Sequence, residues 1–88
     1  MANKFHGEDV VEVGNVAGFR YVITAGNESV LGRKHAAWVY DMESGKPVIS
    51  YCGLLTAGGN KKRVRDYVRR WCRGTRKAWQ DEAARRSA

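Results

Sequence analysis

The sequence has no long run of apolar residues, and it contains few prolines and cysteines. No segment approaches the roughly 18 consecutive apolar residues of a membrane-spanning helix, so we expect no transmembrane segment. The first residues contain no apolar core of the kind that a secretory signal peptide requires. Without that signal, we expect Cys52 and Cys72 to be reduced thiols in a cytoplasmic protein rather than a disulfide in a secreted one.

Acidic residues are scarce in the last third of the chain, and this scarcity makes the protein strongly basic. Residues 61–88 contain eleven Lys or Arg and three Asp or Glu, whereas residues 1–60 contain five basic and six acidic residues. The formal net charge of +7 therefore comes from the C-terminal segment. A positive field of this kind favours a polyanionic partner.

The length and composition are those of one small folded domain comprising residues 1–88. Hydrophobic residues make up 43% of the chain and charged residues 28%, which is ordinary for a globular protein. A chain of this length buries roughly 60–65% of its unfolded surface, which is enough for one core. We expect a loose N-terminus at residues 1–7, a sheet within residues 8–55 and a helix over residues 60–86.

Alternation of apolar and polar residues predicts a small antiparallel sheet of three to four strands. The clearest alternation places Phe19, Tyr21 and Ile23 on one face of a strand. Gly45 supplies the positive φ of a turn between the last two predicted strands. With the helix that follows, the predicted fold is an α+β meander. A loop at residues 25–34 and a turn at residues 43–46 interrupt four predicted strands, at residues 8–13, 18–24, 35–42 and 47–53.

From Lys61 onward the apolar period changes from two residues to 3.6, which predicts an amphipathic helix packed on the sheet. Asn60 is a favourable N-cap residue for this helix. Gly74 lies outside the apolar stripe and costs about 1 kcal/mol against Ala, which makes it the position where the helix can break or kink. The stripe covers an arc of roughly 120° and consists of Val64, Tyr67, Val68, Trp71, Cys72, Thr75, Ala78 and Trp79.

The aromatic residues of the predicted strands are expected to form the sheet face that meets this helix. We expect Tyr67 and Trp71 to pack against that face, and Cys52 and Cys72 to fill the same interface as small apolar groups. The alternative is a platform on which the bases of single-stranded nucleic acid stack. The need of a small domain for core rings favours the first interpretation. The strand residues concerned are Phe19, Tyr21, Trp38, Tyr40 and Tyr51.

The helix is predicted to carry two rows of cations beside its apolar stripe. Asp66 is the one acidic residue between positions 61 and 80. Like charges three or four residues apart destabilise a helix by about 0.2–0.5 kcal/mol per pair. We therefore interpret the rows as a surface for nucleic-acid phosphates or an acidic partner, with an ordinary solvated face as the alternative. The first row is Lys62, Arg65, Arg69, Arg73 and Arg76, and the second is Arg63, Arg70 and Lys77.

The start of the helix is a candidate anion-binding site. Gly58, Gly59 and Asn60 precede Lys61 and Lys62, so cations stand at the positive end of the helix dipole. A bound phosphate or carboxylate would offset that unfavourable placement, because free backbone N–H groups point outward at this end. The motif is not a P-loop, since Gly59 occupies the position where that motif needs lysine.

Residues 58–68, GGNKKRVRDYV, resemble the start of the last helix in double-stranded-RNA-binding domains. Residues 32–39 are similar to that family's second strand, and residues 18–80 follow its β-β-β-α order. The family opens with a helix, which the N-terminal residues do not predict, and Val64 and Val68 replace its usual alanines. The resemblance implies phosphate contacts across an A-form duplex rather than sequence readout. The matching residues are Gly58, Gly59, Asn60, Lys61, Lys62 and Arg65.

The sequence contains no pattern typical of a catalytic or metal site. His6, His35 and the two cysteines include no short-range ligand pair. The carboxylates at Glu8, Asp9 and Glu12 are typical of a protected edge strand rather than of acid–base catalysis. We therefore expect a non-enzymatic binding module without a metal or cofactor.

Two hypotheses for its function remain. The first is a module whose basic helix binds the phosphates of RNA or DNA. The second is a small phage-type inhibitor or adaptor that binds an acidic host protein or a nucleoprotein complex through the helix and its aromatic residues. Trp79 lies beyond Gly74, where the helix is expected to extend past the sheet, and is a candidate contact for either partner.

Overall fold

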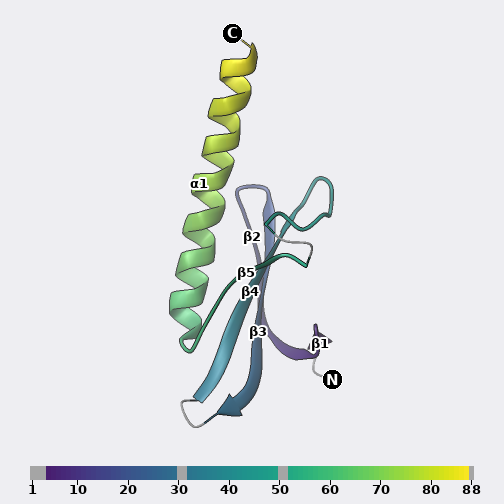
Figure 1. Ribbon diagram of the computed structural model, residues 1–88, viewed down its shortest axis with the longest axis vertical. Coiled ribbons are helices and arrows are strands. Elements are labelled where there is room, and N and C mark those ends of the chain that lie inside the picture. The colour runs from purple at the N-terminus through teal and green to yellow at the C-terminus, as the bar shows by residue number, and fades with distance from the viewer. Residues whose placement is uncertain (1–3, 30–31, 50–51, 88) are drawn as a thin grey trace.

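The structure is a computed structural model that describes residues 4–29, 32–49 and 52–87. It is an antiparallel sheet with one long helix against one of its faces (Figure 1). The sheet has five strands in the order β1-β2-β3-β4-β5, one more than the upper end of the predicted range. The elements are β1 (Lys4–Phe5), β2 (Glu8–Val16), β3 (Phe19–Ser29), β4 (Gly32–Asp41), β5 (Leu54–Gly58) and α1 (Lys61–Ser87).

The α+β meander predicted from the sequence is confirmed, and the additional strand is short. β1 pairs antiparallel with the start of β2, so residues 4–5 are part of the sheet rather than of a loose N-terminus. His6 and Gly7 connect β1 to β2 with φ of 53° and 79°. No helix formed by the described residues is long and apolar enough to cross a membrane.

The central hairpin of the sheet is longer than predicted. β3 and β4 extend through most of residues 25–34, which had been predicted as a loop, and they pair as far as Ser29 and Gly32. A register shift between Ala25 and Glu28 lets the pairing continue past Gly26 and Asn27. The polar and glycine residues of this segment therefore cause an irregularity in the pairing of β3 with β4 and do not end it.

The returning strand begins later than predicted. Pro47 forms an isolated bridge with Tyr40, and the continuous strand β5 starts at Leu54 rather than within residues 47–53. Gly53 has a φ of 87°, and its carbonyl accepts a hydrogen bond of 2.9 Å from Val39 N–H, which directs the chain into β5. The small residues Thr56 and Ala57 of β5 lie opposite the small Ala37 and Ala36 of β4.

Helix α1 extends from Lys61 to Ser87 and continues through Gly74 without a break. Asn60 is the predicted N-cap, since its Oδ1 accepts a hydrogen bond of 3.1 Å from Arg63 N–H. The C-terminal turns of α1 project beyond the sheet (Figure 1). The apolar stripe meets the helix-side core of the sheet, whose buried members are Val16, Phe19, Tyr21, Ile23, Ala37, Val39, Val64, Val68 and Cys72.

Aromatic residues lie on both faces of the sheet, which corrects the prediction of a single aromatic face. The register pairs Tyr21 with Val39 and Val22 with Trp38, and directly paired residues share a face. Phe19 and Tyr21 therefore face α1, whereas Trp38 and Tyr40 belong to a second cluster on the opposite face. Faces alternate at every residue, so the relative phase of two strands depends on their register and is not visible in either strand alone.

The residues predicted to pack against the aromatic face do not all lie on the helix side of the sheet. Cys72 is fully buried in the helix-side core as predicted, but Cys52 packs against the cluster on the opposite face. Trp71 is half-buried, with its ring centroid 5.7 Å from that of Phe19. Tyr67 lies at the edge of the stripe and is 48% exposed. Tyr51 falls outside the described residues.

A register shift in β2 decides which residues of that strand face α1. The shift between Val10 and Glu12 accommodates one extra residue, Val11, which packs against the helix-side core. Beyond it, Val13 pairs with Val22 and Asn15 pairs with Arg20. We call the side of the sheet away from α1 the open face; it carries Val10, Val13, Asn15, Arg20, Val22, Trp38 and Tyr40.

Candidate polyanion-binding surface

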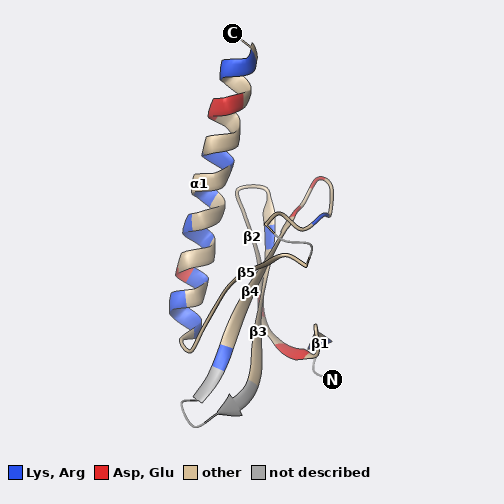
Figure 2. Ribbon diagram, viewed as in Figure 1, with Lys and Arg blue, Asp and Glu red and all other residues tan. Residues whose placement is uncertain are grey.

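Lys and Arg recur along α1 (Figure 2), and five of the predicted cations are exposed on the side of the helix opposite its buried stripe. At 100° per residue they lie within an arc of about 100°. They extend over roughly 22 Å of the helix axis at 1.5 Å per residue. Lys77 also contacts Asp81 at 3.0 Å, in an exposed pair of the kind that contributes little to stability. We call this surface the outward band: Lys62, Arg63, Arg70, Arg73 and Lys77.

The other predicted cations of α1 contact the sheet. Arg65 donates a hydrogen bond of 3.1 Å to Glu12 of β2, and Lys61 Nζ lies 3.8 Å from the same carboxylate. Arg69 Nη1 is 3.5 Å from the hydroxyl oxygen of Tyr21, which itself donates to Glu12 at 2.9 Å. These side chains are part of the joint between helix and sheet, although Lys61 and Arg65 are still 42% and 37% exposed.

Tyr21 is the centre of this polar joint. Burial is the largest cause that raises the pKa of its phenol, and the nearby Glu12 carboxylate raises the pKa further, while the hydrogen bond from Arg69 opposes both. The phenol therefore stays neutral and donates to Glu12. The Tyr21 ring fits because Gly14 has no side chain: a Cβ on Gly14 would lie 2.6 Å from the ring.

Arg76 forms a second joint nearer the C-terminal end of the helix. Its guanidinium donates to the carbonyl of Ala17 at 2.8 Å and to Asp41 at 3.2 Å. The same group lies 4.4 Å from the ring centroid of Phe19 and 5.1 Å from that of Trp79. Trp79, predicted as a partner contact, packs on Phe19 at 5.2 Å between centroids and is still 41% exposed.

The sequence alone could not divide the cations in this way. Arg65, Arg69 and Arg76 lie on the flank of the buried stripe, whereas Lys62 and Arg73 from the same predicted row lie further around the helix. Arg65 and Arg76 are paired with Glu12 of β2 and Asp41 of β4, which are far away in the sequence. Only the folded structure shows that these acidic residues lie beside the helix.

The start of α1 is closed on one side by the protein itself. The side chain of Asn60 accepts the N–H of Arg63, and Glu12 lies beside Lys61. Gly58 belongs to β5 rather than to a separate phosphate-binding turn, and Gly59 is exposed before the cap. Asn60 and Glu12 therefore already contact part of the predicted anion site.

Two residues that sequence reasoning did not select lie near this end of α1. His35 Nδ1 is 3.3 Å from the carbonyl oxygen of Gly59, so the start of β4 is close to the start of the helix. Lys34, adjacent to His35, is exposed and adds a cation from the sheet. Nothing in the sequence indicated that the start of β4 lies close to the start of α1.

Two other possibilities among the described residues are a metal site and a reactive cysteine. Among those residues, no group of three His, Cys, Asp or Glu side chains is placed to hold a metal ion. Burial raises the pKa of the Cys72 thiol to about 11, so this cysteine is protonated and inert near neutral pH.

Comparison with known proteins gave no relative. The chain matched no protein-family model, no curated protein and no solved structure.

Proposed function

We propose that the protein is a non-enzymatic nucleic-acid-binding module that contacts the phosphates of a duplex through the outward band of α1. The observation that carries the proposal is the segregation of charge in the domain. Glu12 and Asp41 are paired with inward cations, whereas the outward band presents five cations with Asp66 as the one acidic residue between them. A surface of one sign along a rigid helix matches the regular charge of a nucleic-acid backbone.

The position of the helix supports contact with an extended ligand. The domain is 53 Å long, and α1 is its longest element, with an outer side that the sheet leaves free (Figure 2). The outward band spans several phosphates, since successive phosphates of one strand of B-DNA are about 3.4 Å apart along the axis. Residues 58–68 resemble the last helix of double-stranded-RNA-binding domains, and Lys62 is the matching basic residue that belongs to the outward band. This shared residue favours duplex RNA within this class.

The test is the salt dependence of duplex binding by a variant confined to the outward band. The triple variant Lys62→Gln, Arg70→Gln, Arg73→Gln changes exposed groups that are not part of either joint. If each contacts one phosphate, the slope of log affinity against log salt should decrease by about 2.7 units on B-DNA. Fluorescence anisotropy with matched RNA and DNA duplexes at several salt concentrations measures this slope and the preference for A-form geometry.

A matched control separates local contacts from total charge. The variant Lys4→Gln, Arg20→Gln, Lys46→Gln also removes three positive charges, but from the sheet and its loops. We expect it to change the slope by less than one unit. Equal losses in the two triple variants would show that only net charge matters, and unchanged binding in the outward-band variant would contradict the proposal.

An acidic partner protein is the second candidate, and the exposed Tyr67 favours it. This ring is 48% exposed beside the outward band, and large aromatics next to arginine are common at the centres of protein interfaces. Tyr67→Ala distinguishes the candidates, because a phosphate-binding surface should tolerate the change, whereas a protein partner should lose more than about 1 kcal/mol of binding free energy. A stoichiometric complex that persists after nuclease treatment would support the adaptor.

A further inference from the structure

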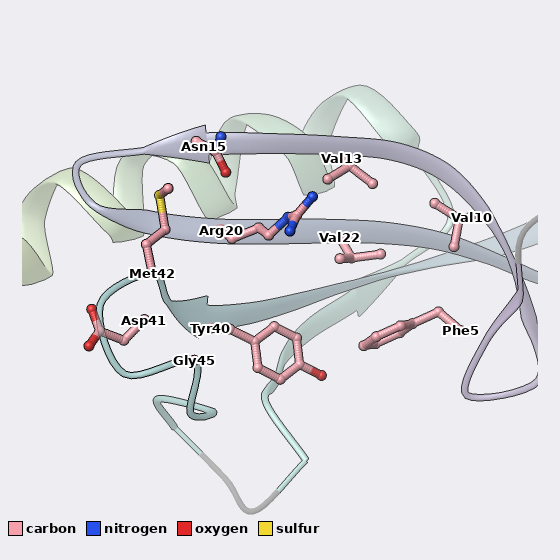
Figure 3. A pocket seen from close by; sticks show the side chains of 10 residues that line it. All are labelled: Phe5, Val10, Val13, Asn15, Arg20, Val22, Tyr40, Asp41, Met42 and Gly45. Carbon is pink, nitrogen blue, oxygen red and sulfur yellow. The ribbon is translucent and has the colours of Figure 1, made fainter.

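The open face of the sheet, away from the outward band, contains a groove of about 580 Å³ (Figure 3). Its walls are largely apolar: Val10, Val13 and Val22 line its length, and Phe5 of β1 closes one end. Met42, which is 53% exposed, lines it near the β4 turn. The volume is within the range of about 300–1,000 Å³ that is typical of sites for small organic molecules.

A guanidinium projects into this apolar groove. Arg20 extends from β3 between Asn15 and Tyr40, its two cross-strand partners (Figure 3). Within the described ranges it has no hydrogen bond, ion pair or ring contact, in contrast to Arg65 and Arg76 of the two helix joints. Arg20 is therefore the charged group of the open face that lacks an internal counterion.

One acidic residue, Asp41, lines the groove, and its carboxylate points away from Arg20 (Figure 3). Asp41 holds Arg76 at 3.2 Å and accepts from the hydroxyl of Ser44 at 3.0 Å. Glu8 accepts from the hydroxyl of Thr24 at 2.8 Å, and that hydroxyl accepts the indole N–H of Trp38 at 3.0 Å. These bonds hold both carboxylates away from Arg20, which leaves its charge available to a ligand.

The other polar groups of the groove indicate where the polar head group of a ligand would bind. Asn15 is exposed on the same face directly opposite Arg20, and its amide can donate a second hydrogen bond beside the guanidinium. The Tyr40 hydroxyl already donates to the carbonyl of Cys52 at 2.9 Å, so its ring contributes an apolar wall. The polar side chains of Arg20, Asn15 and Asp41 therefore lie toward one end of the groove, and the groove is apolar from Val13 toward Phe5 (Figure 3).

We propose that this groove binds a small amphipathic carboxylic acid, with the carboxylate on Arg20 and Asn15 and the apolar body along Val13, Val22 and Phe5. Arginine binds a carboxylate through two parallel hydrogen bonds, which are stronger than neutral ones. The charge of Arg20, unpaired among the described residues, favours an anionic ligand in the groove. The site is on the opposite face from the outward band and does not depend on the nucleic-acid proposal.

The test compares two ligands that differ in the head group alone. Decanoate and 1-decanol are titrated into the 88-residue protein, and binding is followed by backbone amide chemical shifts. Decanoate should bind more tightly, with shifts concentrated on β2, β3 and the Phe5 end of the groove. Arg20→Gln should weaken decanoate about tenfold, the lower part of the range expected for a charged hydrogen bond, and leave decanol unchanged.

Two further variants test whether decanoate binds in this groove and not through the total charge of the protein. Arg70→Gln removes the same charge from the outward band and should leave decanoate binding unchanged. Val13→Asp places a carboxylate beside Arg20 at a position that is 48% exposed, so the fold should tolerate it while decanoate binding is lost. Equal binding of decanoate and decanol by the wild type, or unchanged binding by Arg20→Gln, would overturn the proposal. Self-association in sedimentation velocity that Val13→Asp abolishes would assign the face to a second copy and overturn it as well.

Discussion

Arg65 Nη1 of α1 lies 3.1 Å from Glu12 Oε1 of β2, although 53 residues separate them in the sequence. The other oxygen of the same carboxylate accepts the Tyr21 hydroxyl at 2.9 Å. One acidic side chain therefore connects two strands and the helix. The cations of α1 look equivalent in the sequence, but Arg65 holds the helix on the sheet through Glu12. Cations without such a contact remain for a partner.

The first prediction concerns the strength of this joint. Arg65→Ala should lower the free energy of unfolding by about 1 kcal/mol, because it leaves the partly buried Glu12 without its strongest partner. Arg63→Ala on the outward band should change stability by less than about 0.5 kcal/mol. Urea unfolding of both variants, combined with Glu12→Ala in a double-mutant cycle, measures the coupling. A coupling of zero between Glu12 and Arg65 would show that the joint does not stabilise the fold.

The second prediction concerns the close approach of Tyr21 to Gly14. Gly14→Ala should destabilise the protein by about 1–3 kcal/mol, because the new methyl group would lie 2.6 Å from the ring and force it off the polar joint. Gly59→Ala is the matched control, since a Cβ at that position meets no atom within 4 Å. Thermal melts compare the two variants. Equal stability of the Gly14 variant and the wild type would mean that Tyr21 does not occupy this position.

The third prediction concerns stability in acid. The hydrogen bond from the Ser44 hydroxyl is the largest cause that holds the pKa of Asp41 below its usual value, and Arg76 lowers it further. Because the folded pKa lies below the unfolded one, this contribution is present above about pH 4 and is lost as the pH falls through the folded pKa. Asp41→Asn should remove that part of the acid dependence, and Ser44→Ala should reduce it. Urea unfolding between pH 2 and 6 measures the profile, and an unchanged slope in Asp41→Asn contradicts the assignment.

The fourth prediction concerns the Cys72 thiol. Burial raises its pKa from 9.0 to about 11, so the unfolded chain loses the proton first as the pH rises. The contribution of Cys72 to stability should therefore be constant below pH 9 and decrease between pH 9 and about 11. In Cys52→Ser, where Cys72 is the remaining cysteine, a thiol reagent at pH 8 should react at the rate of unfolding. Rapid reaction of the folded variant would show that Cys72 is accessible.

Helix α1 was predictable because its signals are local. Asn60 at the cap and apolar residues every three or four positions predict a helix over residues 60–86, and the structure places it at Lys61–Ser87. The helix continues through Gly74 without a break, because the backbone hydrogen bonds of a long helix and its packing on the sheet outweigh about 1 kcal/mol of glycine propensity.

The strand boundaries were less predictable because pairing is not local. Residues 54–58 contain the small residues typical of a breaker, yet they pair with β4 at His35 to Trp38. Trp38 and Tyr21 looked alike as aromatic members of alternating strands, and the register placed them on opposite faces. No property of either strand by itself specifies that phase.

The sequence by itself determined the charge of this protein, its α+β class and the position and amphipathic character of its helix, because composition and helical periodicity depend on neighbouring residues. Only the tertiary structure decided what each charge does. Arg65 and Arg76 are paired with acids from β2 and β4, Arg70 and Arg73 are left facing solvent, and Arg20 projects alone into an apolar groove. These three outcomes differ because ion pairing and burial depend on residues brought together from distant parts of the chain, and strand register sets those distances.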